Sequence, residues 1–143
     1  MDTQNFKNHG RLVPGFHYVA FSLLLAVLIG SIVMLFKDCG REDYFDAVLI
    51  VALTIATILV AWFTRVFSLK AQDRAIRAEE NFRCYLATGK QLDSRLKMAQ
   101  IIALRFAGDD EYVALSKRAA DENLSAKDIK MSIKNWKADN YRV

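Results

Sequence analysis

The side chains that most often carry catalysis or bind metals are few in this chain and dispersed along it. Its 143 residues include two histidines and two cysteines, and these form no cluster at metal-ligand spacing. No HExxH sequence and no glycine-rich phosphate loop is present. The sequence therefore predicts no catalytic residue, no metal site and no cofactor, and we interpret the chain as a non-enzyme.

Small residues recur at fourfold spacing inside the two longest apolar stretches. Such residues let helix backbones approach closely in lipid, where association depends on packing more than on hydrophobicity. Ordinary composition explains them equally well, so two interpretations stay open: a helix-packing seam, within the chain or towards a neighbouring chain, or no role. The candidate seam residues are Ala26, Gly30, Ala52, Ala56 and Ala61.

Four lysines form a basic stripe on the last predicted helix, namely Lys127, Lys130, Lys134 and Lys137. A solvated helix face explains this stripe. The functional alternative is attachment to an acidic partner or to anionic lipid headgroups, worth about 1 kcal/mol per lysine near the surface. The stripe lacks the phosphate-contact density and the base-reading side chains of a DNA-binding helix, so we expect no nucleic acid partner.

The candidate seam residues lie in two long uncharged stretches. The first, 16–36, holds 21 residues without Asp, Glu, Lys or Arg, which at about 1.5 Å per residue spans the roughly 30 Å hydrocarbon core of a bilayer. The second, 47–64, holds 18 such residues. Signal peptides have shorter apolar regions that end at a cleavage site, so we read the first stretch as a retained span. The two stretches predict a membrane hairpin.

The charges around the hairpin predict its orientation. Seven Lys and Arg residues lie outside its two ends, within about 20 residues, whereas only Lys37 and Arg41 lie in the loop, so both termini are expected in the cytoplasm. From Arg65 onward the chain carries 16 of the 20 bases and 11 of the 16 acids, a formal charge of +5. This excess is compatible with lying near anionic lipid.

The two cysteines are expected on opposite sides of the membrane. Cys39 falls in the loop and Cys84 in the tail, so they cannot pair with each other. Both are interpreted as unpaired thiols. The alternative for Cys39 is a bridge to the same residue of a second chain in an oxidising compartment.

The tail after the second span has the pattern of consecutive helices. No Pro or Gly interrupts 65–88, so the second span is expected to continue as one helix to Gly89, with an apolar stripe of Ala75, Ala78, Phe82, Tyr85 and Leu86 that needs a partner surface. Three shorter helices follow. We expect the first to be capped by Asp93 or Ser94 and the second by Asp109 or Asp110, and the third to open at Ser125 and carry Ile129, Ile133 and Trp136.

The predicted fold class is an all-α membrane protein, a two-helix transmembrane hairpin whose second helix continues into a small cytosolic helical bundle. Its predicted segments are an N-terminal polar segment (1–15), the hairpin (16–66, with spans at about 16–36 and 46–66 and a loop at 37–45) and the cytosolic tail (67–143).

Two tail segments carry a resemblance. Residues 74–123 read RAIRAEENFRCYLATGKQLDSRLKMAQIIALRFAGDDEYVALSKRAADEN, and residues 124–142 read LSAKDIKMSIKNWKADNYR. They resemble an uncharacterised family of small bacterial membrane proteins with two spans and a helical cytosolic tail, sometimes labelled permease. The resemblance implies a bacterial inner-membrane protein and assigns no activity or binding residue. The permease label conflicts with the residues, because two spans without ionisable groups at mid-depth form no translocation path alone.

These observations favour a small accessory subunit or an oligomeric scaffold that acts through protein–protein contacts of its tail. Membrane lipid and either further copies of the chain or a larger membrane complex are the expected partners. The alternative is a membrane-anchored regulator or sensor whose tail binds a soluble partner or ligand.

Overall fold

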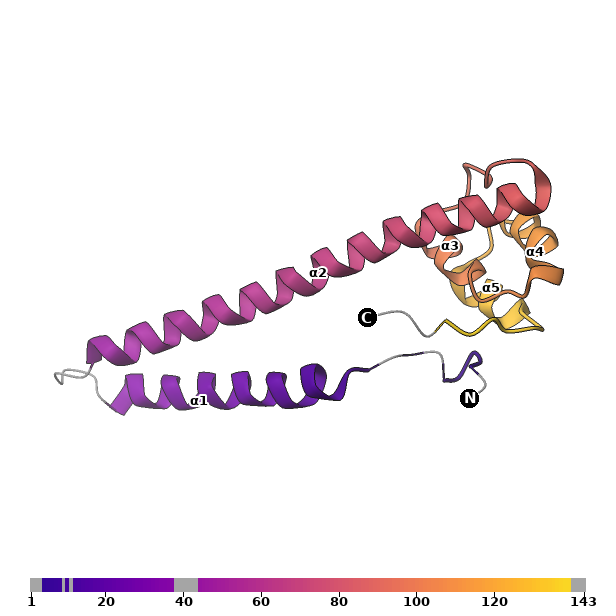
Figure 1. Ribbon diagram of the computed structural model, residues 1–143. Helices are drawn as coiled ribbons and strands as arrows, with labels where there is room; N and C mark the ends of the chain where they lie inside the picture. Colours follow the sequence, from indigo (N-terminus) through magenta and orange to yellow (C-terminus); the bar gives the residue numbers. More distant parts are fainter. Residues whose placement is uncertain (1–3, 9, 11, 38–43, 140–143) are drawn as a thin grey trace. The chain divides into compact units, whose positions relative to one another are not determined.

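A computed structural model describes residues 4–8, 10, 12–37 and 44–139, and every regular element in these ranges is a helix (Figure 1). The prediction of an all-helical chain is confirmed. In chain order the elements are the π-helix η1 (Gly15–Ala20), α1 (Phe21–Lys37), α2 (Tyr44–Thr88), α3 (Met98–Leu104), α4 (Asp109–Asp121) and α5 (Ala126–Ser132). Contacts divide the chain into two compact units, the hairpin unit (Leu12–Ser68) and the tail unit (Met1–Arg11 with Leu69–Val143).

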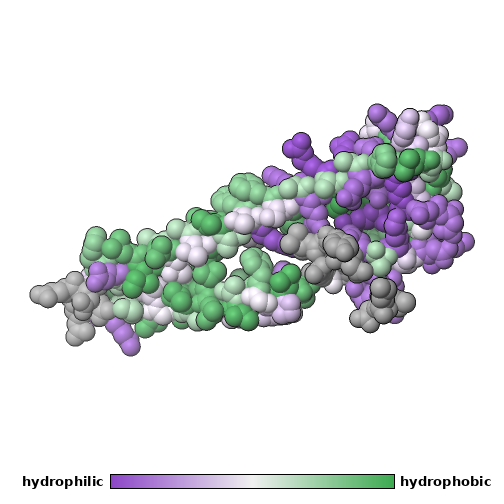
Figure 2. Space-filling view, viewed as in Figure 1, coloured by the Kyte–Doolittle hydropathy of each residue, from purple (hydrophilic) through white to green (hydrophobic). Residues whose placement is uncertain are grey.

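The hairpin unit turns its apolar side chains outward. Two helical stretches, Gly15–Lys37 and Tyr44–Thr88, are long and apolar enough to cross a membrane, with mean hydropathies of 2.8 and 2.5 in their most apolar windows. Only 6% and 11% of the residues in these windows are buried. Figure 2 shows the resulting apolar surface in green along the hairpin unit. The core helix of a soluble domain is mostly buried, so these helices differ from that class.

Among the described residues of the hairpin unit, those that are buried are small or carry a hydroxyl group: Ser31, Ala47 and Thr54. The Ser31 hydroxyl donates to the carbonyl oxygen of Leu28 at 3.0 Å, and the Thr54 hydroxyl donates to that of Ile50 at 2.7 Å. Each buried hydroxyl is therefore satisfied by its own helix, and no polar group of this pair requires water.

Helix α2 runs without interruption from Tyr44 to Thr88, as the sequence predicts. Gly89 ends it in the left-handed region, with φ of +70°, and its N–H donates to the carbonyl oxygen of Tyr85 at 2.8 Å. A residue with a side chain would be strained in this conformation, which explains why glycine stands at the helix end.

The tail unit is a small helical bundle with its own core. Helix α3 packs against α4 and α5, and α4 also packs against α5. Its largest fully buried side chains are Tyr112, Phe106, Ile101, Leu104 and Ile129. Helix α2 completes this core with Ile76 and Cys84, which are 6% and 8% exposed. The tail core therefore depends on residues before Gly89 as well as on the three short helices.

The predicted start of the helix after Gly89 is wrong. Helix α3 begins at Met98 rather than after Asp93 or Ser94, because the Asp93 carboxylate accepts from the backbone N–H of Arg95 at 2.9 Å and closes a turn there. The N-terminal cap is Lys97, whose N–H donates to the Gln100 side chain at 2.7 Å. A local Asx-type bond thus competes with the helix at its start.

Helix α4 follows the prediction except for its cap. Tyr112, Leu115 and Ala119, which helical spacing places on one face, are buried. The cap is Gly108 rather than Asp109 or Asp110, and no side chain bonds it. The carboxylates of the first turn are engaged in tertiary contacts instead, which removes them from the role of a cap.

Helix α5 opens as predicted and ends earlier than predicted. The Ser125 hydroxyl accepts from the backbone N–H of Asp128 at 3.1 Å, which confirms the cap. The helix ends at Ser132, so the expectation that Trp136 lies on it is wrong. Beyond it, the Glu111 carboxylate accepts from the N–H of Asn135 at 2.9 Å, and Ala107 pairs with Trp136 in an isolated antiparallel bridge.

Trp136 nevertheless packs against the tail core, as the sequence suggests. Its side chain is partly buried, and its ring centroid lies 5.2 Å from that of Phe106. The contact comes from the extended chain after α5 rather than from a helix face.

The faces of α2 in the tail unit are distributed unexpectedly. Ile76, Glu80 and Cys84 are the buried residues, and two of the predicted apolar residues, Phe82 and Leu86, are 62% and 70% exposed. The bundle therefore covers a face that contains a glutamate, and the apolar stripe remains on the surface. The reason lies in the ion pairs described next.

Candidate functional site

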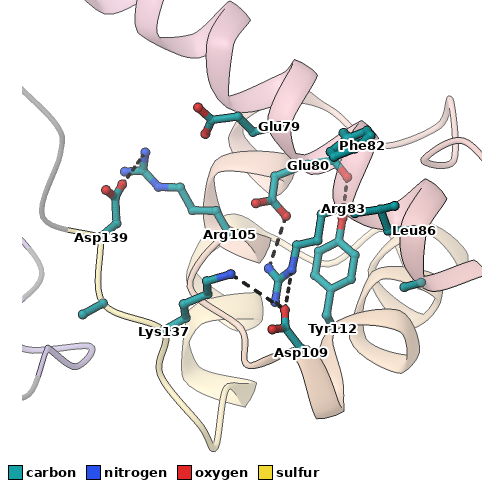
Figure 3. A pocket seen from close by; sticks show the side chains of 12 residues that line it. Glu79, Glu80, Phe82, Arg83, Leu86, Arg105, Asp109, Tyr112, Lys137 and Asp139 are labelled. Carbon is teal, nitrogen blue, oxygen red and sulfur yellow. Dashed lines mark hydrogen bonds and ion pairs between the residues drawn. The ribbon is translucent and has the colours of Figure 1, made fainter.

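The tail unit holds an open groove of about 720 Å³ beside the last turns of α2 (Figure 3). Its lining contains four acids and three bases, together with apolar side chains at α2, so a ligand in it would meet charges of both signs. The lining residues are Glu79, Glu80, Phe82, Arg83, Leu86, Ala87, Arg105, Asp109, Tyr112, Lys137, Ala138 and Asp139.

Arg83 is the centre of the polar network and joins α2 to the start of α4. Its Nε donates to Oδ1 of Asp109 at 2.8 Å, and its Nη2 donates to the carbonyl oxygen of Ala107 at 2.7 Å. Its Nη1 lies 3.4 Å from Oε2 of Glu80. The guanidinium also lies over the Tyr112 ring, 4.1 Å from the centroid (Figure 3). Arg83 is therefore engaged on each of its nitrogens and through its planar face.

Glu80 is a buried carboxylate on the inner face of α2. Burial raises the pKa of Glu80, and the nearby Arg83 guanidinium acts in the opposite direction. The Tyr112 hydroxyl donates to the backbone carbonyl oxygen of Glu80 at 3.1 Å. Burial, and then the adjacent Glu80 carboxylate, raise the pKa of Tyr112, so its hydroxyl remains a proton donor at physiological pH.

Asp109 is the exposed member of the network. Hydrogen bonds from Arg83 hold the pKa of Asp109 below its usual value, although 77% of its side chain is exposed. The Lys137 ammonium lies 3.8 Å from Oδ1 of Asp109. Two cations from different segments thus converge on one carboxylate at the groove.

Arg105 forms a second ion pair at the other side of the groove. Its Nη1 lies 2.9 Å from Oδ2 of Asp139, and only 11% of its side chain is exposed. Its guanidinium lies over the Phe106 ring, and its buried Nε has no hydrogen-bond partner among the described residues. The Asp139 N–H donates to the Gln4 side chain at 2.8 Å, so this pair also holds the N-terminal segment.

The groove combines paired charges with an apolar rim. Its arginines are paired with carboxylates, and its tyrosine is held protonated, so neither is poised as a base or nucleophile. Its apolar rim consists of Phe82 and Leu86, both exposed. An amphipathic surface would find apolar contacts and fixed charges of both signs there.

The candidate seam residues lie mostly on the surface. Ala26, Gly30, Ala52 and Ala56 are exposed and Ala61 is half-buried. A methyl group built on Gly30 would meet no atom of the described chain within 4 Å. Packing of this seam, within the chain or against a neighbouring chain, stays a prediction.

The four lysines do not share one helix face. Lys127 and Lys130 lie on α5, and Lys134 and Lys137 follow its end at Ser132. The reason is again the capture of the chain after α5 by the Glu111 carboxylate, which accepts from the Lys134 N–H at 3.0 Å. Contact of these lysines with lipid headgroups or with an acidic partner stays a prediction.

The structure describes Cys84 and does not describe Cys39. Cys84 is free and buried, with its sulfur 3.7 Å from the Thr88 hydroxyl. Cys39 lies outside the described residues, as does most of the loop between the predicted spans.

The residues that build the groove were not singled out by the sequence. In the sequence, the charges of Glu80, Arg83 and Arg105 resemble ordinary surface charges of amphipathic helices. The contacts of Arg83 with Ala107 and Asp109 join residues that are 24 and 26 positions apart, so no short window shows them. The available signal was weak: Glu80 and Arg83 lie one turn apart on the same face as Ile76.

No group of three or more His, Cys, Asp or Glu side chains that could hold a metal ion occurs in the described ranges. Comparison with curated proteins and with solved structures finds no match. One family model matches, over residues 1–143, and its description is a family of unknown function. The chain therefore belongs to this family of unknown function, DUF6526.

Proposed function

We propose that the chain is a non-enzymatic, multi-pass integral membrane protein that acts through protein–protein contacts of its helical tail, as a small accessory subunit or an oligomeric scaffold. The observation that carries the membrane part is the outward-facing apolar surface, since only 6% and 11% of the two most apolar windows are buried. The cost of leaving such surface in water favours insertion in lipid. Retention of the full chain in membranes after alkaline carbonate extraction tests this, and release would contradict it.

The proposed orientation places both termini in the cytoplasm of a bacterium. The charge count of seven to two supports it. Labelling of intact cells with a membrane-impermeant maleimide should modify Cys39 in the loop. Native Cys84 is a poor reporter because it is buried, so the tail is better probed with Lys117→Cys on the exposed face of α4. Lys117→Cys should react only after permeabilisation, and the opposite pattern would overturn the orientation.

The tail supports the interaction part of the proposal with exposed apolar side chains that its own core does not use. Phe82, Tyr85 and Leu86 are 62%, 56% and 70% exposed on the last turns of α2. Large exposed residues at neighbouring positions are typical of docking surfaces. Pull-down from mild detergent at native expression level should recover a second protein or further copies of the chain. The Phe82→Ser variant should no longer recover these partners. The Val113→Ser variant, changed at an exposed apolar site on α4, should still recover them. A monomer without any bound protein would contradict the proposal.

The groove favours a second candidate, a membrane-anchored regulator whose tail binds a soluble ligand or partner. Its volume of about 720 Å³ is in the range of small-molecule sites. Native mass spectrometry of the purified chain distinguishes the two. A small molecule that is retained by the native chain and lost in Lys137→Glu favours the regulator, whereas a bound protein favours the subunit.

A further inference from the structure

An exposed stripe on α2 repeats at intervals of four and three residues within the tail unit. We name it the outer stripe: Ala71, Ala75, Ala78, Phe82 and Tyr85. Each of its members is exposed, and Phe82 and Tyr85 are 62% and 56% exposed. This spacing is that of the a and d positions of a coiled coil, in which the stripe faces a partner helix.

The spacing is not confined to the tail unit. In the sequence it continues towards the N-terminus through Ser68, Thr64, Ala61 and Thr57, all small residues. A stripe with a seven-residue repeat drifts slowly around a straight helix. A stripe sustained over this length therefore faces a partner throughout only if the partner is a helix that coils around α2 for many turns. Small residues at the seam allow the close approach that helix pairs require in lipid.

The charges beside the outer stripe match a second copy of α2. Taking Ala75 and Phe82 as a positions places Arg74 at g and Glu79 at the following e. In a parallel pair of identical helices, each g residue faces the next e residue of the other helix, so Arg74 of one copy would meet Glu79 of the other, twice by symmetry. Both residues are exposed, and the described chain holds no ion pair for either.

The remaining flanking positions raise no objection. The other g and e residues that face each other along the stripe are Phe67 with Gln72 and Asn81 with Leu86, so no pair of like charges is brought together. An antiparallel pair would lose the contact of Arg74 with Glu79. It would also require two copies inserted in opposite directions, which the charge rule disfavours.

We propose that the outer stripe is a self-association surface, through which two copies of the chain pair in parallel along α2 with reciprocal contacts between Arg74 and Glu79. The inference rests on the proposed membrane insertion, because the bilayer holds the copies in one direction and at high local concentration. It names the partner as a second copy of this chain. Phe82 and Tyr85 supply the large apolar contacts and the alanines the close approach.

The test is disulfide cross-linking of the full chain in lipid vesicles at low protein density. Cys39→Ser serves as the parent, and buried Cys84 is retained as an unreactive thiol. Ala78→Cys in the stripe should form a dimer on oxidation, whereas Arg77→Cys, exposed on another face of the same turn, should remain monomeric. Equal cross-linking at the two positions would overturn the inference.

A charge exchange tests the register in the Ala78→Cys chain. Arg74→Glu should weaken dimerisation about fivefold, because two attractions become two repulsions. Glu79→Arg should do the same, and the double variant should recover the original dimer fraction. No recovery would overturn the reciprocal contact. Carbonate extraction of the same vesicles distinguishes failure of the membrane proposal from failure of this inference. Release of the chain would overturn both. Retention of the chain with equal cross-linking at positions 77 and 78 would overturn this inference alone.

Discussion

Replacement of Arg83 by methionine should be among the most destabilising single changes in the tail unit. Only 15% of the Arg83 side chain and 9% of that of Glu80 are exposed, so Arg83→Met leaves a buried carboxylate without its cation. Breaking such a pair costs about 3 to 5 kcal/mol. The Ala107 carbonyl also loses its donor at 2.7 Å. Protonation of Glu80, which burial already favours, limits the loss, so we expect about 3 kcal/mol.

The assay is urea unfolding of the full chain in mild detergent, followed by the fluorescence of Trp136 in a chain that carries Trp62→Phe. Trp136 is a suitable reporter because its ring packs against Phe106 in the tail core. The matched control is Asp109→Asn, which weakens the same network at a side chain that is 77% exposed and should cost less than about 1 kcal/mol.

A double variant completes the test. Glu80→Gln with Arg83→Met removes both charges, and it should be more stable than Arg83→Met alone because no buried charge remains unpaired. If Arg83→Met and Asp109→Asn lower the free energy of unfolding equally, or if the double variant is no better than the single one, the buried pair does not hold α2 to the bundle and the reasoning is refuted.

Three further changes test other features of the tail unit. Because burial raises the pKa of Glu80 above 4.5, the unfolded chain loses this proton first as the pH rises. The free energy of unfolding should therefore decrease as the pH rises above about 4.5. Glu80→Gln should reduce this decrease in unfolding curves taken between pH 4 and 8. Trp136→Ala should cost about 2 to 4 kcal/mol, since the ring is only partly buried, and unchanged hydrogen exchange in α3 and α4 would show that the ring is no anchor. Gly89→Ala should cost about 1 kcal/mol in the same urea assay through its φ of +70°, with no steric term because the site is open, and an unaltered midpoint would argue against the glycine-dependent helix end.

The sequence predicts helices well where local signals decide. The glycine at 89 ends α2, Ser125 caps α5, and the apolar spacing of Tyr112, Leu115 and Ala119 identifies the inner face of α4. In each case the deciding interaction joins residues a few positions apart, so it is visible in a short window.

The groove escapes such reasoning because its contacts are long-range. Apolar spacing ranks Phe82 and Leu86 as the inward face of α2, yet the structure buries Glu80 and the stem of Arg83 instead. Only the tertiary partners make that burial possible, and Asp109 lies 26 positions from Arg83. The end of α5 has the same origin, since Glu111 captures backbone N–H groups 23 and 24 positions later.

The single long helix α2 also limits how this protein can be divided or recombined. Tyr112 donates to the backbone of Glu80, and Ile76 and Cys84 complete the tail core, so a soluble fragment that starts after Gly89 would lack part of its own interior. The boundary between the two units therefore lies within α2, near Leu69, rather than at Gly89. A chimaera that grafts this tail onto another anchor would need to carry α2 from about Leu69 onward.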